Sequence, residues 1–218
     1  MTALSSRRSP DRARDLTERS PNLFDALVSL LQLFMQYNHF MDSYKFIDGV
    51  YVYFVTFTII DWLPIFINPE PVKIINDSLR YCINNKSLRI HAYVTMPNHI
   101  HLIVYDSNFD NDRLGKTLME FRKFTGNKLA NYIDKTLAES LSLVIRSKAL
   151  NDRIRQVWRP GWHAEGLASE AFLLQKMQYI HENPVRKGFV EFPEHWVHSS
   201  AGYWINMEES EIPIVPFV

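Results

Sequence analysis

Two histidines separated by one residue are the first candidates for chemistry in this sequence. His99 and His101 flank Ile100 in a run typical of a strand, His-Ile-His-Leu-Ile-Val-Tyr. Side chains alternate between the faces of a strand, so both imidazoles lie on one face, about 6.5–7 Å apart along it. Two neutral imidazoles at that spacing can converge on one metal ion. For an isolated His-x-His pair, the alternative is two polar side chains on the solvated face of an edge strand.

A second group of candidates lies on a helix expected over residues 171–183. Ser169 is a good N-cap and Pro184 is expected to end the helix. Tyr179 and Asn183 are four residues apart, so they share one helix face. Taken alone, each has an ordinary alternative, because Asn183 could cap the helix C-terminus and Tyr179 could be a half-buried tyrosine.

These candidates lie within a predicted order of elements, β-α-β-β-α, followed by a further helix. Strands are expected at 50–60, 88–95 and 99–105, and helices at 71–85 and about 113–134. Met96-Pro97-Asn98 predicts a tight turn that joins the second and third strands as a hairpin. The class is α+β, with an antiparallel sheet and helices packed on one face. A ferredoxin-like βαββαβ fold follows if a short strand lies near residues 163–166.

Composition restricts the class of protein further. The chain has 218 residues, 24 Lys and Arg, 24 Asp and Glu, and one cysteine, Cys82. A single cysteine excludes an internal disulfide framework and a cysteine-based zinc site, and it fits the cytoplasm. No stretch is long and apolar enough to suggest a membrane span. We expect residues 1–40 to be a poorly ordered leader with at most one short helix, and residues 41–218 to form one domain with an acidic C-terminal tail.

The net charge of zero conceals an uneven distribution along the chain. Residues 111–159 carry eleven Lys and Arg against five acidic residues, whereas residues 188–218 carry five glutamates and no Lys or Arg. A basic stretch is often only a solvated helix face. The alternative is a surface that follows a phosphate backbone, since such binding depends on where charges lie rather than on their sum.

Three blocks of the sequence together resemble the single-tyrosine HUH transposases of the IS200 type, most closely the REP-associated tyrosine transposases. The blocks are Tyr-Phe-Val-Thr-Phe-Thr (53–58), Ala-Tyr-Val-Thr-Met-Pro-Asn-His-Ile-His-Leu-Ile-Val (92–104) and Tyr-Ile-His-Glu-Asn-Pro-Val-Arg-Lys-Gly (179–188), followed by Trp196 and Ser199-Ser200. The resemblance covers roughly residues 44–204. Either site motif alone would be a weak signal, but the two in this order are specific.

The resemblance implies a metal-dependent endonuclease and strand-transferase that acts on single-stranded DNA bearing hairpins or REP-type palindromes. In that interpretation His99 and His101 match the histidine pair, and Asn183 matches the third ligand of Mg²⁺ or Mn²⁺. Tyr179 matches the nucleophile that forms a 5′-phosphotyrosine intermediate. The protein would be a monomer or homodimer in the bacterial cytoplasm, at the nucleoid while acting.

Two other functions remain open at this point. One is a protein of the same fold that binds structured DNA or RNA without catalysis. The other is a small-molecule metalloenzyme that uses the histidine pair, with a structural Tyr179.

Candidate DNA contacts come from the basic stretch and from the residues that follow the second motif. They are Arg122, Lys123, Lys128, Arg153, Arg155 and Arg159, then Arg186 and Lys187. Trp158 and Trp162 lie among these arginines and could stack on unpaired bases. Burial in the core is the equal alternative for both tryptophans.

Overall fold

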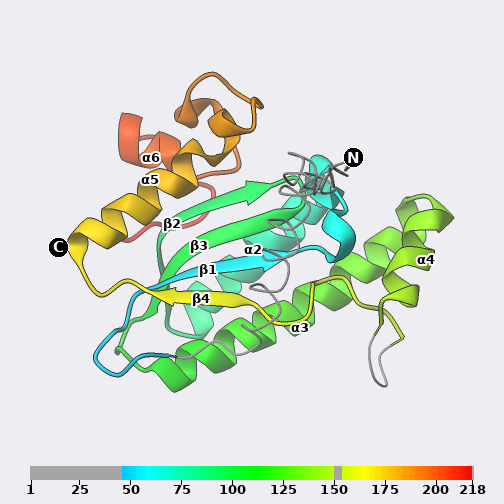
Figure 1. The fold of residues 1–218 in the computed structure, drawn as a ribbon, viewed down its shortest axis with the longest axis horizontal. Helices are drawn as coiled ribbons and strands as arrows, with labels where there is room; N and C mark the ends of the chain where they lie inside the picture. Colours follow the sequence, from blue (N-terminus) through cyan, green and yellow to red (C-terminus); the bar gives the residue numbers. More distant parts are fainter. Residues whose placement is uncertain (1–45, 150–153, 218) are drawn as a thin grey trace, which may run out of the picture. The chain divides into compact units, whose positions relative to one another are not determined.

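The computed structural model describes residues 46–149 and 154–217 (Figure 1). Within these residues, four strands form one antiparallel sheet in the order β2-β3-β1-β4. The strands are β1 (Tyr53–Thr58), β2 (Leu88–Met96), β3 (His99–Asp106) and β4 (His163–Gly166). With α2 (Pro69–Asn85) and α3 (Asn111–Thr136) between them, they form the predicted βαββαβ unit. The leader predicted for residues 1–40 lies outside the described residues.

The remaining elements follow or interrupt this unit. They are η1 (Ile60–Trp62), η2 (Ile65–Ile67), α4 (Glu139–Ser147), α5 (Glu170–Arg186), η3 (Pro193–His195) and α6 (Ala201–Asn206). α4 forms in a segment where the sequence analysis above places no helix. None of the helices in the described part of the chain is long and apolar enough to cross a membrane.

The two helices of the βαββαβ unit cover one face of the sheet, as predicted (Figure 1). Apolar residues recur along α2 at helical spacing, and Val72, Ile75 and Leu79 are buried against the sheet. The N-terminus of α3 is capped by Asp110, whose side chain accepts a hydrogen bond from the Arg113 amide. Local sequence therefore sets where these helices begin and which side of each is buried.

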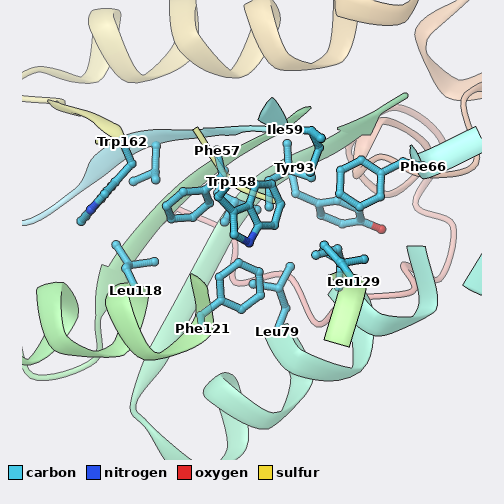
Figure 2. Close-up of a cluster of buried hydrophobic side chains, with 14 of the residues drawn as sticks. Phe57, Ile59, Phe66, Leu79, Tyr93, Leu118, Phe121, Leu129, Trp158 and Trp162 are labelled. Atoms are coloured by element: carbon cyan, nitrogen blue, oxygen red, sulfur yellow. The ribbon is translucent and has the colours of Figure 1, made fainter. Parts of the chain in front are cut away.

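Trp158 and Trp162 belong to this core, so the predicted base stacking by both residues is wrong. Their exposed fractions are 5% and 8%, and Figure 2 shows both rings in the layer between the sheet and the helices, with Phe57 and Phe121. The indole N–H of Trp158 donates to the Thr125 hydroxyl at 3.1 Å. A buried indole with a satisfied donor is a structural residue and has no open face for a base.

We expect Trp158→Ala to lower the free energy of unfolding by roughly 3–5 kcal/mol, because it leaves a large cavity and removes the hydrogen bond from the indole to the Thr125 hydroxyl. Urea denaturation followed by circular dichroism measures this change. Phe124→Ala is the matched control, since Phe124 is an exposed aromatic on α3, and it should cost less than about 1 kcal/mol. Equal losses in the two variants would contradict a core role for Trp158.

The opposite face of the sheet is covered by α5, which packs on β2 and β3. A second apolar cluster joins Phe54, Val94 and Ile103 of the sheet to Leu173 and Ile180 of the helix. The helix begins at the predicted cap, where the Ser169 hydroxyl accepts a hydrogen bond from the Phe172 amide.

The sequence predicts that this helix ends before Pro184, but the helix continues to Arg186. Proline costs the helix one backbone hydrogen bond and adds a steric clash. Pro184 is buried, however, so packing of its ring holds the last turn in place.

The C-terminal segment lies along β2, which is an edge strand of the sheet. Backbone hydrogen bonds join the Val215 amide to the Ile90 carbonyl at 2.9 Å and the Thr95 amide to the His198 carbonyl at 2.8 Å. One of the acidic residues of the tail, Glu211, accepts a hydrogen bond from Asn76 at 2.7 Å. The segment thus satisfies backbone groups that an open sheet edge would expose.

Candidate active site

The two histidines of the His-x-His motif lie side by side on the sheet face that α5 covers. Their ring centroids are 4.6 Å apart, and Ile100 between them is buried on the opposite face. β3 pairs with β1 on one side and with β2 on the other. The alternative of an edge strand with a solvated face is therefore wrong.

Each imidazole uses its Nδ1 atom to contact the protein. Nδ1 of His101 lies 2.8 Å from the hydroxyl of Thr56, which is its cross-strand partner on β1. Nδ1 of His99 lies 2.7 Å from the side-chain oxygen of Asn98, and a carboxamide oxygen only accepts, so this nitrogen carries the proton. No hydrogen bond involves either Nε2 within residues 46–149 and 154–217. In metal-binding histidines, one ring nitrogen typically contacts a protein group that orients the ring, and the other nitrogen binds the metal.

Both histidines are uncharged at neutral pH. Burial lowers the pKa of His99 to about 4, and the charge of Lys187 contributes to the shift. Burial also holds the pKa of His101 well below its ordinary value, helped by His99, Lys176 and Arg186. Neutral imidazole is the form that binds metal ions.

Tyr179 reaches this pair from α5. Its ring centroid lies 5.5 Å from that of His101 and 5.9 Å from that of Phe54, and both contacts are edge-on. The residue is nevertheless 41% exposed. Its phenol therefore stands next to the histidine pair and is also accessible to a ligand from solvent.

Two cations surround the Tyr179 ring. The guanidinium carbon of Arg186 lies 4.4 Å from the ring centroid, and its Nη2 donates to the Tyr179 carbonyl at 2.8 Å. The ammonium of Lys176 lies 6.0 Å from the same centroid and is paired with Glu165 at 2.5 Å. The sequence analysis selects Arg186 but not Lys176. Lys176 lies three residues before Tyr179, and residues three apart on a helix are neighbours, so this spacing could have indicated the contact.

Asn183 lies one turn after Tyr179 on the same helix face and is only 3% exposed. It is not a C-terminal cap, because the helix ends at Arg186 and Lys187 occupies the cap position. No hydrogen bond of its side-chain amide is found among the described residues, but the amide is not fully buried, since the fully buried side-chain atoms without a hydrogen-bond partner there are Asn76 Oδ1 and His198 Nδ1. No cluster of three His, Cys, Asp or Glu able to hold a metal exists in the described part of the chain. Two imidazoles on β3 and an amide on α5, the helix that covers this face of the sheet, are nitrogen and oxygen donors of the kind that metal ions use.

The predicted DNA contacts are divided between different parts of the molecule. Lys123 and Lys128 are exposed on α3, which covers the sheet face away from Tyr179. Arg155 forms an ion pair with Asp134 of α3, with 2.7 Å between Nη1 and Oδ2, and so ties its loop to that helix. Arg153 lies outside the described residues.

Three other predicted cations lie on elements near the histidine pair, and a fourth, Arg122 of α3, contacts one of them. Arg186 and Lys187 end α5, and the Arg159 guanidinium stands over Trp62, whose ring contacts that of His99. Arg122 donates a hydrogen bond to the Arg159 carbonyl. The basic stretch of the sequence is therefore not one continuous surface around the candidate site.

No protein-family model matches the sequence, and no curated protein matches it either. Solved structures do match. One is a REP-associated tyrosine transposase bound to a REP hairpin, with a TM-score of 0.53, 14% sequence identity, and alignment over 82% of this chain and 94% of that one. This chain has the fold of a REP-associated tyrosine transposase. Another match is a proposed transposase from Deinococcus radiodurans, with 17% identity over 65% of this chain and 97% of that one, and a TM-score of 0.41.

The transposase fold brings together blocks that lie far apart in the sequence. The first block is β1, the second spans β2, the tight turn and β3, and the third is the last part of α5. The missed partners Thr56 and Asn98 lie inside the first two blocks. Only the strand pairing shows that Thr56 stands opposite His101.

Proposed function

We propose that this chain is a metal-dependent endonuclease and strand-transferase that acts on single-stranded DNA, with Tyr179 as its nucleophile. The observation that carries the proposal is the Tyr179 ring 5.5 Å from His101, on the face where His99 stands beside it. The fold supports it, because one protein that shares this fold is a REP-associated tyrosine transposase bound to a REP hairpin. We propose hairpin-bearing DNA as the substrate of this chain for the same reason.

His99 and His101, through Nε2, and Asn183, through its amide oxygen, are the residues that would hold Mg²⁺ or Mn²⁺. Neutral imidazoles, and an amide that makes no hydrogen bond within the described residues, fit this role. A bound ion would polarise the scissile phosphate and neutralise the charge that develops on it.

Tyr179 supplies the oxygen that attacks phosphorus. The phenol loses its proton, its oxygen bonds to the phosphate, and the bond from phosphorus to the 3′-oxygen breaks, so that the 3′-oxygen takes up a proton. Arg186 and Lys176 lie against the Tyr179 ring and would stabilise the negative charge that develops on the phosphate. The product is a 5′-phosphotyrosine link with a free 3′-hydroxyl, and the reverse reaction can join a different strand.

The test is a covalent-adduct assay on the full chain with single-stranded, hairpin-bearing oligonucleotides taken from the DNA that flanks its gene. A label at the 3′ end stays with the protein if the link is to a 5′-phosphate. We expect an adduct that survives denaturing electrophoresis with Mg²⁺ or Mn²⁺ and is absent with EDTA. Binding without any adduct would instead favour a non-catalytic DNA-binding or RNA-binding protein. No affinity for nucleic acid at low salt would overturn both.

Thr56→Val is expected to weaken Mn²⁺ binding by roughly 10- to 100-fold, because it removes the hydroxyl that orients the His101 ring. Isothermal titration with Mn²⁺ measures the affinity. Thr58→Val is the matched control, since Thr58 lies on the same strand face and no hydrogen bond joins its hydroxyl to His99 or His101 among the described residues. Equal affinities in wild type and Thr56→Val would show that this hydroxyl does not support a metal site.

A further inference from the structure

An exposed tryptophan lies next to the candidate site, at a position that the sequence analysis did not select. Trp62 follows β1 at the end of η1 and is 52% exposed. Its ring centroid lies 6.1 Å from that of His99, with the two rings nearly perpendicular. A large aromatic ring open to solvent beside a proposed nuclease site is available for stacking by a ligand.

The backbone holds Trp62 in a conformation that side chains rarely adopt. Asp61 and Trp62 have φ values of 48° and 56°, both in the left-handed region. The residues before them are fixed by hydrogen bonds from the Ile59 amide to the Asn98 carbonyl at 2.9 Å and from the Ile60 amide to the Val157 carbonyl at 2.7 Å. Strained backbone that its surroundings hold in place is common at ligand sites.

The same bonds attach Trp62 to the turn that carries His99. The Asn98 carbonyl accepts from the Ile59 amide, and the Asn98 side chain contacts Nδ1 of His99. The indole and the imidazole are therefore positioned by one small unit of structure. A nucleotide that contacts His99 therefore lies within one nucleotide length of the Trp62 ring.

The charge beside the indole suits a nucleic acid. The guanidinium carbon of Arg159 lies 5.5 Å from the Trp62 ring centroid, and the Arg159 amide is bound to the Thr58 carbonyl at 2.9 Å. The nearby carboxylate of Asp61 is paired with Lys148 at 3.4 Å. Proteins that bind single strands combine an aromatic platform for bases with cations that contact the backbone.

We propose that Trp62 is a stacking platform for an unpaired nucleobase of single-stranded DNA, next to the nucleotide whose phosphate lies at His99 and Tyr179. Arg159 contacts a phosphate of the stacked nucleotide. The proposal rests on the proposed function, since it takes single-stranded DNA as the ligand of that site.

The test compares two probes at low salt, both labelled with fluorescein and measured by anisotropy. One is a 20-mer of thymidylate, and the other is a 20-mer of abasic deoxyribose phosphates with the same charge. Stacking tolerates any base, so the unknown target sequence is not needed. We expect Trp62→Ala to weaken binding of the thymidylate probe by roughly 5- to 150-fold and to leave binding of the abasic probe within about twofold of wild type. Trp62→Phe should retain most of the affinity.

Phe109→Ala is the matched control. Phe109 is also an exposed aromatic with a positive φ of 57°, but it follows β3 at the end of that strand away from His99. It should bind both probes as wild type does. Thermal unfolding followed by circular dichroism verifies that all three variants are folded.

Three results would overturn the proposal: no binding of the thymidylate probe by wild type, no loss in Trp62→Ala, or equal losses on both probes. Unchanged binding by Trp62→Ala would favour a protein partner for this ring. Failure of the proposed function gives a different result. In that case Trp62→Ala would still weaken binding of the thymidylate probe, while wild type would form no covalent adduct on any hairpin-bearing strand.

Discussion

Tyr179→Phe is expected to form no covalent protein–DNA adduct, with the rate falling by at least roughly 10³-fold, while its affinity for hairpin-bearing single strands stays within a few-fold of wild type. The substitution removes only the oxygen that attacks phosphorus. The ring that contacts Phe54, His101 and Arg186 remains, so the fold and the surface of the site should persist. Denaturing electrophoresis of a 3′-labelled strand measures the adduct, and anisotropy measures binding.

Tyr81→Phe is the control for this experiment. Tyr81 is an exposed tyrosine on α2, which covers the other face of the sheet, so its loss should leave adduct formation unchanged. An adduct that persists in Tyr179→Phe would assign the nucleophile to another residue.

A mixing experiment uses the same variant. Tyr179 contacts His101 of its own chain, so an equimolar mixture of Tyr179→Phe and His101→Ala should remain inactive. Recovered activity would show that the nucleophile acts in a partner's site.

His99→Ala is expected to lower the affinity for Mn²⁺ by at least roughly 100-fold and to abolish cleavage. It removes one of the two imidazoles that we propose as ligands, and the remaining two donors hold an ion poorly. His99 is only partly buried, so the apoprotein should fold. Calorimetric titration measures the affinity. Mn²⁺ should also raise the melting temperature of wild type and not that of the variant, because a ligand that binds only the folded state stabilises it.

The matched control is His195→Ala, which removes an exposed histidine of η3 that packs on Phe192, the residue before this helix. It should bind Mn²⁺ and cleave DNA as wild type does. If His99→Ala keeps both the Mn²⁺ affinity and the Mn²⁺-dependent rise in melting temperature, the histidine pair is not a metal site. The small-molecule metalloenzyme that uses this pair would be excluded by the same result.

Much of the fold could be predicted because its signals are local. Alternation along 99–105 places His99 and His101 on one face, and Pro97-Asn98 makes the tight turn before them. Helical spacing places Tyr179 and Asn183 on one side of α5. These rules depend only on neighbouring residues, and the structure follows them.

The contacts between distant residues could not be predicted in the same way. Which tryptophan is buried depends on what packs against it, so Trp158 and Trp162 lie in the core whereas Trp62 remains exposed beside His99. Pro184 stays within α5 because its ring is buried.

The sequence by itself determined the order of the elements from β1 to α3, the faces of β3 and α5, and the uneven distribution of charge. Only the tertiary structure decided that α5 lies over the histidine pair, that Thr56 meets His101, and that Lys123 and Lys128 lie on α3 whereas Arg159 lies beside Trp62. The physical reason is the range of the interactions. Backbone geometry sets the direction of a side chain from its own segment, but burial and charge at any point are set by segments that arrive from elsewhere in the chain.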